Sequence, residues 1–138
     1  ASNEDLDNLK KDISATDYQK ALYIIEENKR VHLFAEAIEQ NDLEDLGDLL
    51  FQSHHGLSNQ YKVSCKELDF LVNRAKESPE VIGARMMGGG FGGCTINLVL
   101  KSGLETFKDQ VSDDFKNEFG KACSVYNVKL SKGTHIVK

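Results

Sequence analysis

The sequence predicts an α+β sandwich, in which an antiparallel sheet has helices packed on one face and follows an N-terminal helical segment. Apolar residues recur at helical spacing through the first half, whereas the second half alternates apolar and polar residues around a glycine-rich stretch. Three helices followed by the order strand, strand, helix, strand, strand are typical of this class. We expect the 138 residues to form a single domain, residues 1–138.

The first helices follow from the apolar pattern of the N-terminal half. Residues 16–40 suit one long amphipathic helix or two abutting ones. Asn41 and Asp42 should break this pattern and cap the next helix, whose leucines between residues 43 and 50 point toward a core. Gly47 inside that helix is expected to weaken it by ~1 kcal/mol relative to alanine.

A third helix is indicated by both of its ends. Ser64 and Glu67 have capping-box spacing, so the Ser64 hydroxyl should accept from the Glu67 N–H while the carboxylate reaches back to the Ser64 N–H. Apolar residues between 68 and 75 then form a buried stripe. Pro79, the only proline, follows where it cannot interrupt a helical hydrogen bond.

The second half changes to the period of strands. Strands are predicted at residues 81–86 and 93–100, on either side of the glycines, and a helix at residues 104–119. Alternating residues predict two further strands at 122–130 and 135–137. With these two strands the predicted sheet has four.

The run from Gly88 to Gly93 is the most informative stretch, because five of its six residues are glycines. Such a run costs conformational entropy and indicates positive φ angles or close approach to the backbone. Its G-x-G-x-x-G spacing does not predict a dinucleotide site, since a strand rather than a helix follows. Cys94 stands where a P-loop needs lysine, and the protein-kinase signatures are absent. Two interpretations of the glycine run therefore remain: a tight turn with a bulge, and a loop that a ligand approaches closely.

Charge and cysteine content exclude several classes of function. The net charge of −5, with no basic block, argues against nucleic-acid and anionic-membrane partners. No apolar run approaches the ~20 residues of a membrane span, and there is no signal peptide. Three cysteines without a C-x-x-C motif indicate reduced thiols and a cytoplasmic protein. Because the chain opens with Ala1 rather than methionine, we expect a piece of a longer protein.

No catalytic residue and no metal site can be assembled from the remaining side chains. Neighbouring helical side chains point about 100° apart, so His54 and His55 cannot chelate one metal, and we expect them at the surface or at a helix end. Cys94 is expected to be a small buried hydrophobe at the start of its strand. Arg85, beside the glycines, could offer charge to an anion or could simply be solvated.

Three segments together carry a resemblance to a known family. They are Ser53-His54, Y-K-V-S-C-K-E-L-D at residues 61–69, and G-A-R-M-M-G-G-G-F-G-G-C at residues 83–94. In this order and at these intervals they closely resemble the C-terminal domain of galactokinases, members of the GHMP small-molecule kinase superfamily. The resemblance extends from about residue 18 to the end of the chain. It implies a ferredoxin-like α+β sandwich with additional helices, which agrees with the pattern above.

The resemblance also implies a parent enzyme that transfers the γ-phosphate of ATP, with Mg²⁺, to the C1 hydroxyl of galactose. In that family the catalytic aspartate and most sugar-binding residues lie in an N-terminal lobe, whose motifs this sequence lacks. We therefore expect galactose and ATP to bind through that missing lobe, and this fragment alone to be inactive. Only the family's third motif transfers, and it implies the following nucleotide-binding residues: Arg85, Gly88, Gly89, Gly90, Phe91, Gly92 and Gly93.

Further expectations concern individual positions of this motif. Met87 stands where family members commonly have threonine, so a hydroxyl is missing there. Glycine backbone N–H groups are the expected hydrogen-bond donors to the nucleotide phosphates, and Gly90→Val should block the close approach of a ligand to the loop. Phe91 is expected to be exposed, because the surface of the other lobe is missing. A galactokinase-like sugar sensor and an N-acetylgalactosamine kinase are the alternatives, and no oligomeric state is predicted.

Overall fold

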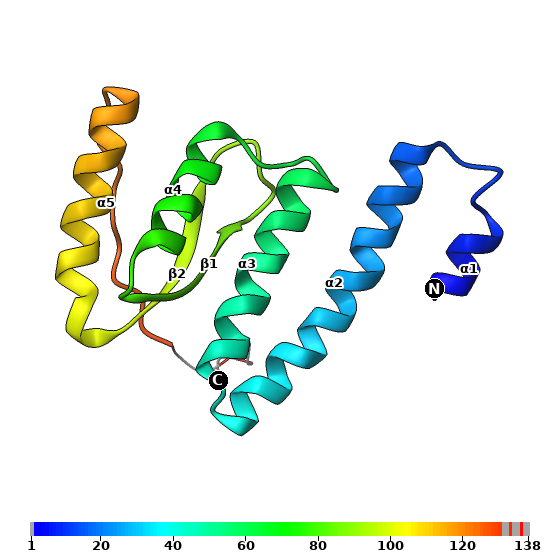
Figure 1. Ribbon diagram of the computed structural model, residues 1–138, viewed down its shortest axis with the longest axis horizontal. Coiled ribbons are helices and arrows are strands. Elements are labelled where there is room, and N and C mark those ends of the chain that lie inside the picture. Colours follow the sequence, from blue (N-terminus) through cyan, green and yellow to red (C-terminus); the bar gives the residue numbers. More distant parts are fainter. Residues whose placement is uncertain (1, 131–132, 134–135, 137–138) are drawn as a thin grey trace.

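The computed structural model describes residues 2–130 together with residues 133 and 136. Within this part of the chain, helices precede and follow a two-stranded antiparallel sheet, so the predicted α+β class is confirmed (Figure 1). The elements in order are α1 (Asn3–Asn8), α2 (Ala15–Gln40), α3 (Leu43–Asn59), α4 (Lys66–Glu77), β1 (Val81–Met87), β2 (Cys94–Val99), the 3-10 helix η1 (Lys101–Gly103) and α5 (Leu104–Phe119). Among the described residues, no helix combines the length and the apolar character that a membrane span requires.

The helix ends show which capping predictions are correct. Asn41 ends α2 in the left-handed conformation at φ 55°, and the Asp42 carboxylate accepts from the Asp45 N–H at 3.0 Å, so the predicted break and cap are confirmed. The predicted capping box is wrong. Cys65 is the N-cap of α4 and makes no side-chain capping bond, while the Ser64 hydroxyl donates to Asp69 instead. A carboxylate acceptor gives the hydroxyl a charge-assisted bond.

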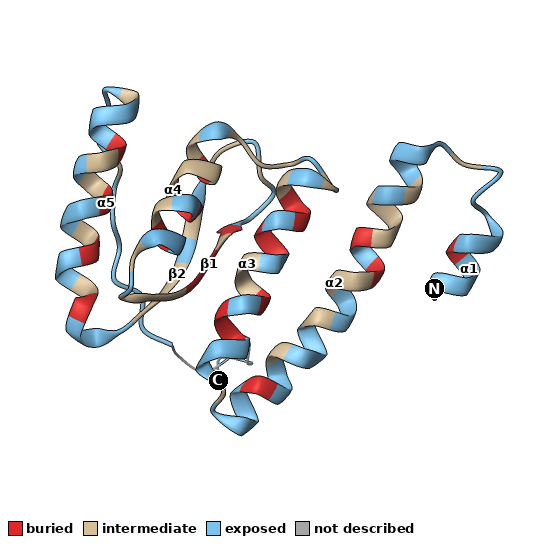
Figure 2. Cartoon of the chain, in the orientation of Figure 1, coloured by how far each residue is buried: buried red, intermediate tan, exposed pale blue. Residues whose placement is uncertain are grey.

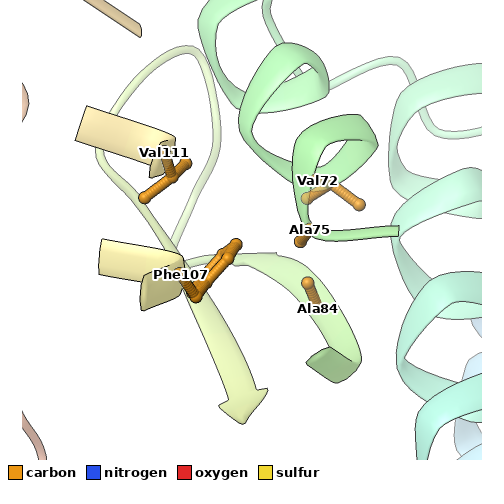
Figure 3. Packing of buried hydrophobic residues seen from close by; sticks show 5 residues of the cluster. All are labelled: Val72, Ala75, Ala84, Phe107 and Val111. Atoms are coloured by element: carbon orange, nitrogen blue, oxygen red, sulfur yellow. The ribbon is translucent and has the colours of Figure 1, made fainter. Parts of the chain in front are cut away.

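The main hydrophobic core lies between α4, α5 and the sheet. Figure 3 shows side chains from α4, β1 and α5 converging in this layer. Its buried members are Val72, Ala75, Ala84, Phe107 and Val111. The small Ala75 and Ala84 are both fully buried, which lets α4 pack close to β1. Burial of this apolar surface fixes the sheet beneath the two helices.

On its other side, β1 packs against α3 through glycines. A Cβ on Gly47 would overlap the carbonyl oxygen of Ile82, and a Cβ on Gly83 would lie 2.6 Å from the Gly47 Cα. Gly47 therefore allows the backbones of α3 and β1 to touch. This contact explains why a glycine stands within the helix, where the sequence alone indicated only that it would weaken the helix. Buried residues are concentrated on α3 and β1, whereas α2, which packs on α3, is largely exposed (Figure 2).

The strand predicted at residues 122–130 is not present. This segment is described as irregular chain, and the sheet formed by the described residues contains only β1 and β2. Val125, Tyr126 and Val128 remain exposed. Alternation predicts which way side chains point, but a strand also needs a neighbouring backbone to pair with, and this segment pairs with none of the described residues. Apart from Ile136, the strand predicted at 135–137 lies outside the described residues.

Candidate functional site

The glycine run joins β1 to β2 as a hairpin loop. Met87 and Cys94 form the last cross-strand pair, and residues 88–93 close the turn between them. Four of the five glycines have positive φ, at values of 85°, 83°, 135° and 95° for Gly88, Gly90, Gly92 and Gly93. These values fall where side chains are strained, so the backbone shape itself requires glycine. Gly89 is the loop glycine without positive φ.

The loop is attached on one side and open on the other. The Phe91 N–H donates to the Val63 carbonyl oxygen at 2.7 Å, and a Cβ on Gly90 would overlap that same oxygen. A Cβ on Gly88, Gly89 or Gly92 would instead meet nothing within 4 Å. The close neighbour of Gly90 is therefore Val63, in the chain between α3 and α4. Open space that a ligand could occupy remains at Gly88, Gly89 and Gly92.

Phe91 lies at the exposed tip of this loop. Its side chain is 77% exposed, which confirms the expectation, and its φ of 58° is unusual for a residue with a Cβ. Phe91, Gly92 and Gly93 line a groove together with residues of α4, β2, α5 and the segment 121–128. The Lys121 ammonium pairs with the Glu67 carboxylate in this groove at 3.1 Å. The loop therefore presents backbone and one aromatic ring to an open surface.

Arg85 is directed toward α2. Its Nη1 lies 3.2 Å from Glu27 Oε1, and its Nε donates to the Met86 carbonyl oxygen at 3.0 Å. Glu27 also accepts from Ser53 of α3 and from Arg30. The guanidinium thus links β1 to α2 rather than standing free in solvent, and Glu27 extends this link to α3. The part of Arg85 in anion binding stays a prediction.

His54 is buried beside the start of the loop, so the expected surface position is wrong. Its Nδ1 accepts the Met86 N–H at 3.2 Å, and its Nε2 lies 3.1 Å from Asp69 Oδ1. An Nδ1 that accepts leaves the proton on Nε2, which then donates to the carboxylate. Burial lowers the pKa of His54, and the nearby Asp69 charge opposes that shift only in part.

Asp69 gathers three donors around His54. Its Oδ1 also accepts the Ser64 hydroxyl at 2.6 Å, and its Oδ2 accepts the Ser58 hydroxyl at 3.1 Å. We call His54, Asp69, Ser64 and Ser58 the His54 cluster. Sequence reasoning missed it, although Ser64 and Asp69 belong to the V-S-C-K-E-L-D segment that carried the resemblance. The spacing of one helix could not show that α3, α4 and β1 meet at this point.

The cysteines form no site of their own. Cys65, Cys94 and Cys123 are free thiols. Cys94 is exposed, so its expected burial is wrong, because it lies at the loop end of β2 and lines the open groove. Across the part of the chain that the structure describes, no group of three or more metal-ligating side chains could hold a metal ion.

Comparison with known proteins shows the family. The family model described as GHMP kinases C terminal matches residues 34–117, which include both the glycine loop and the His54 cluster. The chain belongs to this family. Galactokinase of Thermotoga petrophila is 38% identical over 132 residues, or 96% of this chain and 37% of that protein. Galactokinase of Enterococcus faecalis is 40% identical over 83% of this chain and 30% of that protein.

A solved structure agrees with these relatives. The crystal structure of Lactococcus lactis galactokinase in complex with galactose superposes with a TM-score of 0.84 and 35% identity. The superposition covers 91% of this chain and 33% of that one. The chain thus spans about a third of the length of the curated relatives that it matches. The GHMP C-terminal fold implied by the resemblance is confirmed.

Proposed function

We propose that the 138 residues form one domain, the C-terminal lobe of a galactokinase that transfers the γ-phosphoryl group of ATP to the C1 hydroxyl of galactose. The products are galactose 1-phosphate and ADP, and the hydroxyl proton leaves to a base in the other lobe. Membership of the GHMP kinase family and the galactokinase relatives at 38% and 40% identity support this proposal. The fit to a galactokinase that was solved with galactose adds a structural argument.

The observation that carries the proposed role is the open backbone at Gly88, Gly89 and Gly92. Phosphoryl transfer depends on positioning and on stabilising negative charge that spreads over the phosphate oxygens. Backbone N–H groups in successive unusual conformations can supply that stabilisation without an acid or a base. The loop therefore lines the nucleotide and sugar cleft, with Phe91 at its rim.

ATP is the phosphoryl donor in this proposal, and Mg²⁺ accompanies it. The described residues offer no cluster of carboxylates or imidazoles that fits a metal ion. In this proposal the chain contributes backbone donors and the shape of the cleft, and Arg85 stays a candidate for anion binding. When bound, Mg²⁺ supplies charge neutralisation on the phosphates.

The proposal is tested with the full-length protein in a coupled assay of ADP release. We expect turnover with galactose, and no turnover by the purified 138-residue chain, because the catalytic aspartate that the resemblance implies belongs to the other lobe. Turnover by the short chain would contradict this division of roles. Turnover with N-acetylgalactosamine in place of galactose would support the related kinase instead. Binding of galactose and ATP without turnover would support a sugar sensor.

A further inference from the structure

We infer that His54 and Asp69 are positioning residues that hold both attachments of the glycine loop in the shape required for phosphoryl transfer. The inference rests on the proposed function for the loop, but its structural part stands on hydrogen bonds that can be measured separately. Neither residue needs to touch substrate. They act on the reaction through Met86, which lies in β1 just before the loop, and through Val63, which accepts the N–H of Phe91 at the tip of the loop.

The first attachment fixes where the loop begins. Met86 is fully buried and lies two residues before Gly88. Its N–H points away from the sheet to His54 Nδ1 on α3, so the imidazole takes the place of a missing strand at this edge of β1. Loss of this acceptor would leave a buried N–H without a partner, which is costly and favours local movement.

The second attachment fixes the tip of the loop. Val63 accepts the Phe91 N–H, and its own N–H donates to the Leu57 carbonyl oxygen at 3.0 Å. The next residue, Ser64, donates to the same Asp69 oxygen that receives His54 Nε2–H. Through Ser64, Asp69 therefore holds the Val63 carbonyl group that binds the tip of the loop. His54, its partner, holds β1 where that strand leads into the loop.

The imidazole is suited to this double task. It is a buried polar group with both nitrogens engaged, one as acceptor and one as donor. An apolar side chain could fill the same volume but could not link α3, α4 and β1. A shift of the loop by even a fraction of an ångström would move its N–H groups away from the phosphates, and phosphoryl transfer is sensitive to such displacement.

The test compares variants of the full-length protein by hydrogen exchange over residues 86–93 and by steady-state kinetics. We expect His54→Ala to speed exchange at Met86 and Phe91 at least about tenfold, and to lower kcat at least about tenfold with KM for galactose changed less than about threefold. His54→Asn keeps an acceptor near the position of Nδ1, so it should restore much of the protection at Met86. Ser64→Ala removes one hydroxyl and provides a milder second test if His54→Ala does not fold.

Two control variants separate positioning from general stability. His55→Ala changes an exposed neighbour on the same helix, and Val111→Ala weakens the core on α5. We expect Val111→Ala to lower the melting temperature while leaving kcat and loop exchange at 25 °C close to wild type. The inference is overturned if Val111→Ala reproduces the kinetic loss, or if His54→Ala and Ser64→Ala leave exchange and kcat unchanged.

Failure of the proposed function gives a different pattern. If the wild-type full-length protein phosphorylates no sugar, the kinetic assay contradicts the proposed kinase function but does not test whether His54 and Asp69 hold the loop. Exchange at Met86 and Phe91 then decides the positioning inference by itself. Unchanged exchange in His54→Ala overturns it, and faster exchange restricted to residues 86–93 supports it.

Discussion

Two neighbouring glycines of the loop give a matched pair for testing why the run exists. Gly90→Ala places a Cβ at a residue with φ 83°, against the carbonyl oxygen of Val63. Gly89→Ala places the same atom one residue earlier, where φ is not positive and nothing lies within 4 Å. The two substitutions change composition equally, so any difference between them reports on local structure.

The magnitude for Gly90→Ala follows from three contributions. A left-handed conformation costs alanine about 1–2 kcal/mol. Displacement of Val63 weakens the bond from the Phe91 N–H, which has a net value of about 1 kcal/mol. Restriction of the unfolded chain returns ~0.5 kcal/mol. We therefore expect Gly90→Ala to lower the free energy of unfolding by about 2 kcal/mol, whereas Gly89→Ala should raise it by ~0.5 kcal/mol, since only the restriction of the unfolded chain applies there.

The assay is urea unfolding of the 138-residue chain, followed by circular dichroism. The midpoint should fall for Gly90→Ala with the slope unchanged, since a similar surface is exposed on unfolding. Hydrogen exchange at Phe91 should rise in the same variant. Equal midpoints for the two variants would refute the reasoning, because they would mean that the contact with Val63 does not constrain the loop.

Two further predictions concern the support behind the loop. Gly47→Ala should lower the free energy of unfolding by about 1–3 kcal/mol, although alanine is the better helix former, because its Cβ overlaps the Ile82 carbonyl; equal or greater stability in urea would contradict this packing. Burial holds the pKa of His54 below its ordinary value of about 6.5, so the unfolded chain binds a proton that the folded chain does not. The contribution of this pKa difference to the free energy of unfolding is complete above that pH and falls on acidification, so the free energy of unfolding should fall more steeply than in His54→Gln. Identical pH dependence of the free energy of unfolding in the two proteins would contradict this prediction.

Local signals account for the parts of the fold that the sequence predicted well. The helix at residues 104–119 and the break at Asn41 depend on apolar spacing and capping chemistry within a few residues. The two strands beside the glycines were also predicted to within one residue at each end. The choice between one and two helices at residues 16–40 needed the structure, which shows α2 as a single helix.

Contacts between distant segments could not be predicted in this way. His54 was expected at the surface because nothing near it in sequence shows that Met86, 32 residues later, donates to its ring. The local pattern at Gly90 also could not show that an added Cβ would meet the carbonyl oxygen of Val63, and close approach of a ligand to this glycine stays a prediction. The segment 122–130 alternates like a strand but has no pairing partner among the described residues. In each case the missing information is a tertiary neighbour rather than a local preference.

The central claim is that open loop backbone approaches the phosphates, and Gly89→Val in the full-length protein tests it most directly. Gly90→Val is unsuitable, since its side chain would first collide with Val63. At Gly89 the added atoms enter open space, so folding should be preserved while kcat/KM for galactose phosphorylation falls strongly. A fall of less than about threefold, under ~0.7 kcal/mol, in a stably folded variant would contradict the claim.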